Sequence, residues 1–115
     1  MLELNFTNHE IAQDMIRLIQ KEKGLTESQC ISLAVNSKTC KQIIDTGWAS
    51  IALSMWGHDN PEREWLLLDN PIVDVELEND KEQLIEKISS KENVDIETAV
   101  SYFLLFTMEA LGYHI

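Results

Sequence analysis

The stretches Leu2-Glu3-Leu4-Asn5-Phe6-Thr7 and Val73-Asp74-Val75-Glu76-Leu77-Glu78 decide the fold of this chain, because apolar and polar residues alternate in both. Alternation with a period of two places the apolar side chains on one face of a β-strand and the polar side chains on the other. In the second stretch the polar face consists of three carboxylates. The pattern therefore predicts two half-buried strands, near 2–7 and 73–78.

Each predicted strand is followed by a predicted helix. Thr7 with Glu10, and Asn79 with Glu82, have the three-residue spacing of a capping box, which predicts that a helix begins at each place. Apolar residues then recur at the i, i+3, i+4 spacing of one buried helical stripe. These residues are Ile11, Met15, Ile16 and Ile19 in the first helix and Leu84, Ile85 and Ile88 in the second.

Both helices have matching stop signals. Gly24 and Asn93 are the residue types that most readily adopt the left-handed conformation at a helix end. A new N-cap follows two residues later, Thr26 or Asp95, and predicts second helices over 27–45 and 96–111. The strand-helix-helix order thus occurs twice, which indicates an internal repeat. The cap-to-stop distance is 17 residues in the first copy and 14 in the second.

The first copy resembles the ribbon-helix-helix family of DNA-binding regulators. The most specific stretch is Glu22-Lys23-Gly24-Leu25-Thr26-Glu27-Ser28, which is similar to that family's turn between its two helices. The resemblance covers residues 2–44, and covers 73–111 less closely because Asn93-Val94-Asp95 replaces the glycine-led turn.

In that family, paired strands form an antiparallel ribbon whose outward side chains enter the DNA major groove, and the N-termini of the second helices hold phosphates. The resemblance therefore implies a ribbon formed within the chain by the two copies. The DNA-binding residues that it implies are Glu3, Asn5 and Thr7 on the strand and Gly24, Leu25 and Thr26 at the turn.

The expected fold class is mainly α with a short antiparallel β-ribbon, as a tandem ribbon-helix-helix-like arrangement. Residues 1–46 form the first unit, 47–71 a connector, and 72–115 a second, acidic unit packed on the first as one domain. The alternative is an α+β domain in which 48–56, 63–69 and 72–78 make an antiparallel meander between helical pairs. The connector contains Trp48, Trp56 and Trp65, which we expect to pack into the core rather than to stack on bases.

The charge distribution departs from that of a DNA reader. Nine basic against twenty acidic residues give a net charge of −11, and the segments 1–46, 47–71 and 72–115 carry −1, −3 and −7. Asp74, Glu76 and Glu78 would repel DNA phosphates. Three interpretations of this strip remain: a solvated face that protects a sheet edge, a docking surface for a basic protein, or paired carboxylates in acid-base or metal chemistry, for which the rest of a site is missing.

Chemistry-bearing motifs are absent from the sequence. There is no phosphate-binding loop, no H-E-x-x-H and no nucleophile elbow, so we expect a non-enzyme without a cofactor or a metal. His58, Asp59 and Glu62 flank an Asn-Pro turn and are interpreted as a polar loop, and Cys30 and Cys40 as buried apolar residues.

The chain also gives expectations about location and assembly. It lacks an apolar run long enough to span a membrane and a basic leader followed by an apolar stretch, which favours the cytoplasm. Apolar residues fill 11 of the 16 positions from 96 to 111, so this helix must be enclosed by the rest of the fold or by another chain. A homo-oligomer, such as a dimer, is therefore expected.

Two functions fit these observations. The first is a small intracellular regulator of the ribbon-helix-helix type, either a transcriptional repressor or an antitoxin-like protein, which binds DNA through the first unit. The alternative is an acidic protein-binding module, such as an immunity protein or a phage-type inhibitor, which binds a basic partner through Asp74, Glu76 and Glu78.

Overall fold

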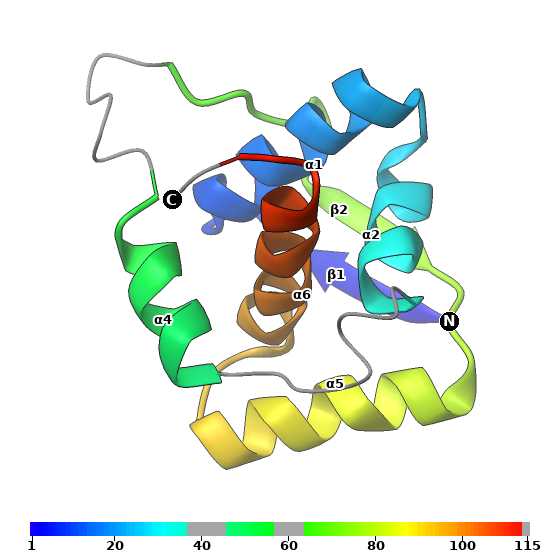
Figure 1. The fold of residues 1–115 in the computed structure, drawn as a ribbon. Helices are drawn as coiled ribbons and strands as arrows, with labels where there is room; N and C mark the ends of the chain where they lie inside the picture. The colour runs from blue at the N-terminus through cyan, green and yellow to red at the C-terminus, as the bar shows by residue number, and fades with distance from the viewer. Residues whose placement is uncertain (37–45, 57–63, 114–115) are drawn as a thin grey trace.

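The computed structural model describes residues 1–36, 46–56 and 64–113. Within these ranges the chain is mainly helical with one two-stranded antiparallel sheet, which confirms the expected fold class (Figure 1). In chain order the elements are β1 (Leu2–Asn5), α1 (Glu10–Lys23), α2 (Glu27–Asn36), α4 (Thr46–Ser54), β2 (Ile72–Val75), α5 (Asn79–Glu92) and α6 (Ile96–Ala110).

The predicted ribbon forms between β1 and β2, although each strand is shorter than its alternating stretch. Leu4 lies opposite Val73, and Glu3 lies opposite Asp74. Leu4 and Val75 are fully buried, whereas Glu3 and Asp74 are exposed. The alternation of the sequence thus separates a core face from a solvent face, as predicted.

The two strand-helix-helix copies are related by a constant offset. The first residues of α1 and α5, Glu10 and Asn79, are 69 positions apart in the sequence. The last residues, Lys23 and Glu92, are also 69 positions apart. The ribbon has matching symmetry, because Leu4 pairs with Val73, the residue 69 positions later. When a residue of one copy pairs with the equivalent residue of the other copy, the two-fold axis that relates the copies passes through that pair. The ribbon is therefore a pseudo-dimer contact made within one chain.

The starts of the first helices differ from prediction. α1 begins at Glu10 after His9, and α5 begins at Asn79 after Glu78, with no side-chain cap in either case. The side chain of Asn5 accepts hydrogen bonds from the backbone N–H of Thr7, at 3.1 Å, and from its hydroxyl. This local turn competes with the helix for Thr7. The two predicted capping boxes are wrong, and α1 and α5 have the same length of 14 residues.

The predicted helix stops and second N-caps are confirmed. Gly24 and Asn93 have φ of 66° and 54°, in the left-handed region. Thr26 forms a reciprocal capping box with Gln29, in which its N–H donates to the Gln29 amide oxygen at 3.0 Å and its hydroxyl accepts from the Gln29 N–H at 3.2 Å. Asp95 accepts from the Thr98 N–H at 3.0 Å.

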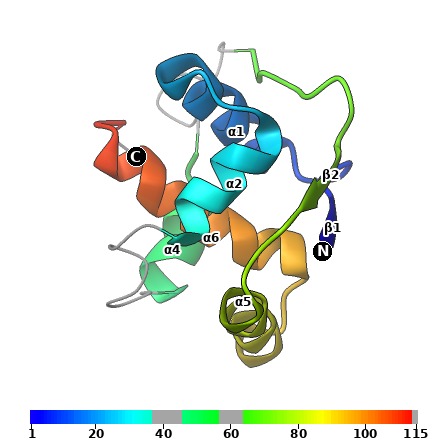
Figure 2. The same cartoon turned by 90° about the vertical axis from the view of Figure 1, so that its right-hand side faces the viewer.

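Helix α6 is the central element of the fold. It packs against α1, α2, α4 and α5, and Figure 1 shows it surrounded by these helices. Figure 2, turned by 90°, views α5 nearly along its axis, with α6 crossing above it. The fully buried residues of α6 are Ala99, Val100, Phe103, Leu104, Leu105 and Met108. Packing within the chain therefore accounts for its apolar composition, so the composition of α6 no longer supports the expected oligomer.

The connector contains a helix where the α+β alternative required a strand. Residues 46–54 form α4, and residues 64–69 are extended but belong to no sheet, so the predicted meander is wrong over the described part of the connector. Trp56 is buried as expected, and Trp48 is half-buried against Phe106 with ring centroids 5.0 Å apart. Trp65 instead remains 37% exposed.

Two buried polar side chains of α1 hold the extended segment in place. Asp14 accepts from the Leu66 N–H at 3.0 Å, and Gln13 accepts from the Leu68 N–H at 2.9 Å. The indole N–H of Trp56 also donates to Asp14, at 2.8 Å. These side chains take the hydrogen bonds that a neighbouring strand would otherwise make.

Candidate functional site

The outward face of the ribbon is the surface that the sequence singled out for binding. Glu3 and Asn5 of β1 and Asp74 of β2 are exposed on it, together with Ile72, which is 46% exposed. Neither strand contains a lysine or an arginine. Glu3 lies directly opposite Asp74, a like-charge pair that weakens a ribbon. The face is thus acidic or neutral at every position.

The acidic strip continues past the end of β2. Glu76 and Glu78 are both exposed, so all three predicted partner-binding carboxylates face solvent. Glu78 also occupies the N-cap position of α5. Carboxylates at a helix N-terminus are stabilised by the helix dipole, which gives this charge a structural role as well. We name Glu3, Asp74, Glu76 and Glu78 the acidic ribbon surface.

The predicted DNA-reading residues of the first copy are partly used within the chain. Thr7 is exposed but lies beyond the end of β1, where its hydroxyl donates to Asn5. The side-chain oxygen of Asn5 is therefore occupied in this turn. The backbone N–H of Asn5 donates to Glu97 at 3.0 Å, which brings a third carboxylate-bearing segment to the edge of the ribbon.

Two backbone donors of the predicted phosphate-holding turn already form hydrogen bonds within the chain. The Gly24 N–H donates to the Gln20 carbonyl at 2.7 Å, and the Thr26 N–H donates to Gln29. The Leu25 carbonyl accepts from the Gln20 side chain at 3.2 Å. Glu27 is the first residue of α2, so a carboxylate stands at the helix N-terminus that would receive the phosphate.

The corresponding turn of the second copy is more acidic. Asp95 takes the place of Thr26, and Glu97 follows in the first turn of α6. Partial burial raises the pKa of Asp95, but hydrogen bonds from Thr98 and the neighbouring His9 outweigh it and hold the pKa below its usual value. Asp95 therefore remains charged, and an arriving phosphate would meet two carboxylates.

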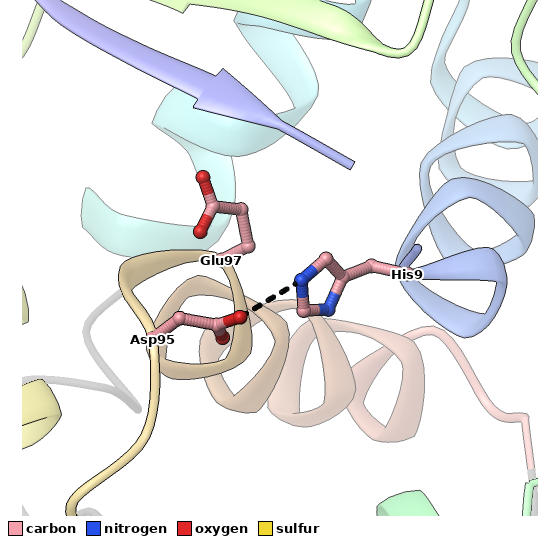
Figure 3. Close-up of side chains that lie close together, drawn as sticks. All are labelled: His9, Asp95 and Glu97. Carbon is pink, nitrogen blue, oxygen red and sulfur yellow. Dashed lines mark ion pairs between the residues drawn. The ribbon is translucent and has the colours of Figure 1, made fainter. Parts of the chain in front are cut away.

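Asp95 and Glu97 meet His9 where the start of α1 approaches the start of α6 (Figure 3). The His9 Nε2 lies 3.1 Å from an Asp95 carboxylate oxygen. One ligand atom from each of the three side chains lies within 4.8 Å of the others. We name His9, Asp95 and Glu97 the junction triad. Sequence reasoning identified Asp95 only as a helix cap and did not select His9 or Glu97, since only the fold brings their two segments together.

A cavity of about 460 Å³ adjoins the same junction. It lies between the start of α1 and the connector, and its lining combines polar and apolar side chains. The lining residues are Thr7, Asn8, His9, Glu10, Ile11, Ala12, Leu53, Trp65 and Ser101.

Of the remaining sequence-predicted groups, the structure describes Cys30, which adds no reactive site. Cys30 is buried, and burial together with nearby Glu27 raises the pKa of its thiol to about 11, so it stays protonated at neutral pH. Cys40 and the group His58, Asp59 and Glu62 lie outside the described residues.

Known proteins supply no assignment for these surfaces. Comparison of the chain with protein-family models, curated proteins and solved structures finds no match. Within the described ranges, no helix combines the length and the apolar character needed to cross a membrane. The functional argument therefore rests on the geometry and charge of the ribbon and of the helix starts beside it.

Proposed function

We propose that this protein is an acidic binding module on a ribbon-helix-helix-type scaffold, and that its acidic ribbon surface docks on a basic protein. One observation carries the proposal: each position that such a scaffold would turn toward DNA is acidic or neutral. These positions are Glu3, Asn5, Ile72 and Asp74 on the ribbon and Glu27, Asp95 and Glu97 at the starts of α2 and α6.

The scaffold part of the proposal is supported by the symmetry of the ribbon. Ribbon-helix-helix proteins pair two copies of a strand-helix-helix unit through antiparallel strands, and here one chain supplies both copies, with Leu4 opposite Val73 at the pseudo-twofold axis. Both helix pairs follow the strands at the same 69-residue offset. An arrangement of this kind presents one continuous ribbon face without a second chain.

The charge part of the proposal is supported by the energy of bringing like charges together. A carboxylate 4–8 Å from a phosphate is repelled by about 0.5–1 kcal/mol in water before screening by salt. DNA binding normally gains its affinity from neutralised phosphates, and the ribbon offers no cation for that purpose. Against a lysine- or arginine-rich protein surface the same interactions change sign and accelerate association.

The geometry of the ribbon also keeps a DNA-binding regulator, either a repressor or an antitoxin-like protein, as the second candidate. Its support is the two-fold ribbon itself, whose width fits a major groove, and the exposed Asn5, a residue type that reads adenine. The hydrogen bonds from Thr7 to Asn5 must then break when DNA binds.

A charge-reversal experiment with a matched control tests the proposal. One variant changes Asp74, Glu76 and Glu78 to Lys, and the control changes the exposed acids Glu10, Glu86 and Glu109 to Lys, so both variants have the same net charge. Binding to an arginine-rich peptide and to a DNA duplex is measured by fluorescence anisotropy at several salt concentrations.

We expect the wild-type protein and the control variant to bind the peptide, the ribbon variant to lose that binding, and the wild-type protein to ignore DNA at low salt. Equal loss in both variants would contradict a local docking surface, because net charge alone would then explain the binding. Wild-type binding to DNA that weakens in Asn5→Ala would favour the regulator instead.

A further inference from the structure

We infer that the junction triad, His9, Asp95 and Glu97, is a binding site for a divalent transition-metal ion such as Zn²⁺, with water completing the coordination. This inference goes beyond the proposed docking function and does not depend on it. The His9 Nε2 and the Asp95 oxygen are 3.1 Å apart. Two ligands bound to one Zn²⁺ at usual bond lengths are separated by about 3.0–3.4 Å. The spacing of this pair therefore matches one edge of a zinc coordination polyhedron.

The third ligand lies within reach of the same ion. Each side chain of the triad offers one ligand atom, and all three atoms lie within 4.8 Å of one another. Figure 3 shows His9 approaching from the start of α1 and the two carboxylates from the start of α6. A side-chain rotation of Glu97 brings its carboxylate onto the ion beside the other two ligands. Three protein ligands with an open position are an established coordination pattern for zinc.

Each ligand is oriented by a group outside the triad. The buried Phe6 ring meets the His9 ring edge to face, with centroids 6.3 Å apart. Thr98 donates to one Asp95 oxygen at 3.0 Å, while the other oxygen points to His9. The Asn5 N–H donates to one Glu97 oxygen at 3.0 Å. Such outer partners fix ligand orientation in metal sites, so His9 and Asp95 need little further ordering, and the ion has to reorient Glu97 alone.

The chemistry of the ligand set selects the class of ion. Two carboxylates with one neutral imidazole carry a charge of −2, which a divalent cation neutralises. Imidazole favours zinc, copper, iron and nickel, whereas calcium and magnesium prefer sites built from oxygen ligands alone. The site is therefore expected to prefer Zn²⁺ over Mg²⁺ and Ca²⁺.

The pseudo-symmetry of the fold provides an internal comparison. At the 69-residue offset, the counterparts of His9, Asp95 and Glu97 are Glu78, Thr26 and Ser28. That set has one carboxylate and no imidazole. The helices that carry these counterparts, α5 and α2, also lack the close packing that joins α1 to α6, so the metal-binding set and its junction occur on one side of the pseudo-symmetric fold and are not a requirement of the repeat.

Metal binding has a mechanical consequence, because the ligands come from both copies. His9 belongs to the first strand-helix-helix unit, and Asp95 and Glu97 belong to the second. An ion held by all three ties the start of α1 to the start of α6 and stabilises only the folded chain. At a free-ion concentration about 100-fold above the Kd, the Tm should rise by about 11 °C.

The test uses the full chain, freed of metal with a chelator and titrated with ZnCl2, MgCl2 or CaCl2 while calorimetry and thermal unfolding are recorded. The variants are chosen to preserve the fold. Asp95→Asn keeps a good N-cap residue, Glu97→Gln keeps an acceptor for the Asn5 N–H, and His9→Gln keeps a polar side chain. Glu78→Gln, at the residue 69 positions after His9, is the matched control.

We expect one saturable Zn²⁺ site, a Tm increase absent with Mg²⁺ and Ca²⁺, and at least tenfold weaker zinc binding in each triad variant but not in the control. Unchanged zinc affinity in His9→Gln would overturn the inference, since the ion would then bind elsewhere. An equal response to Mg²⁺ would overturn it as well, because the site would only be attracting counterions.

Discussion

Gln13 connects three parts of the fold, and its replacement gives a sharp test of the structure. The side chain lies on α1 and is 4% exposed. Its amide nitrogen donates to the Phe6 carbonyl at 2.7 Å, and its amide oxygen accepts from the Leu68 N–H at 2.9 Å. It therefore joins the end of the ribbon to the extended segment of the connector.

In Gln13→Leu, the Leu68 N–H loses its hydrogen bond in a buried setting, whereas the Phe6 carbonyl loses one bond and still accepts from the His9 N–H at 2.8 Å. An unsatisfied buried backbone group costs about 1–3 kcal/mol and the loss of one further hydrogen bond about 0.5–1.5 kcal/mol, so the substitution should lower the free energy of unfolding by about 1.5–4.5 kcal/mol. For a chain of this size, 1 kcal/mol corresponds to about 4 °C in Tm, so Tm should fall by about 6–18 °C. Such a loss is a large fraction of the total stability of an ordinary domain.

Gln13→Glu separates the two hydrogen bonds. The carboxylate still accepts from Leu68, but when ionised it faces the Phe6 carbonyl without a proton to donate. Burial and this oxygen contact both favour the protonated form, so the pKa of the new carboxyl should be raised. A group with a raised pKa in the folded state stabilises it most when protonated, so the deficit against wild type should shrink as pH falls toward 4–5.

Urea unfolding, followed by tryptophan fluorescence at pH 7.5 and 5.0, measures both variants. Gln83→Leu is the matched control, because Gln83 is exposed on α5 and its replacement should change the free energy of unfolding by less than about 0.5 kcal/mol. If Gln13→Leu is as stable as Gln83→Leu, the buried bridge between ribbon and connector is wrong.

Three further changes test local features. Glu3→Lys turns the like-charge pair with Asp74 into an attractive one, so urea unfolding should show a gain of about 0.2–1 kcal/mol that shrinks at high salt. Asn93→Ala forces an alanine into φ of 54°, whereas Asn93→Gly does not, so thermal unfolding should place the alanine variant about 1 kcal/mol below the glycine variant. Folding lowers the pKa of Asp95, so the Asp95 carboxylate stabilises the folded chain at pH values above its unfolded pKa. This stabilisation is lost as pH falls through the pKa of the folded state. The Asp95→Ala variant should therefore lose less stability than the wild-type protein over this acidic range, measured by acid unfolding.

The sequence determined the local elements of this protein because their signals act over a few residues. Alternation in the two stretches predicted the strands, and the left-handed residues Gly24 and Asn93 predicted where the first helices end. Thr26 and Asp95 were correctly identified as N-caps, since a cap is satisfied by a residue three positions away.

Local signals failed where two of them competed. Thr7 and Asn79 are residue types that commonly cap helices. Thr7 instead donates a hydrogen bond to Asn5 in a turn, and α1 begins three residues after Thr7. That error concealed the constant 69-residue offset, because it made the first helices differ in length. The stretch from Trp48 to Trp56 has no clear period. Its residues up to Ser54 belong to α4, which packs against α6, with Trp48 against Phe106.

Tertiary structure alone decided the symmetry of the ribbon and the candidate metal site. The pairing of Leu4 with Val73 depends on how two distant segments fold together, and alternation fixes the face of a strand but not its partner. His9 and Asp95 are polar residues of ordinary type in the sequence, and they become a potential ligand pair only when α1 and α6 begin side by side. Short-range patterns predict elements, whereas a site assembled from distant segments depends on the packing that brings those elements together.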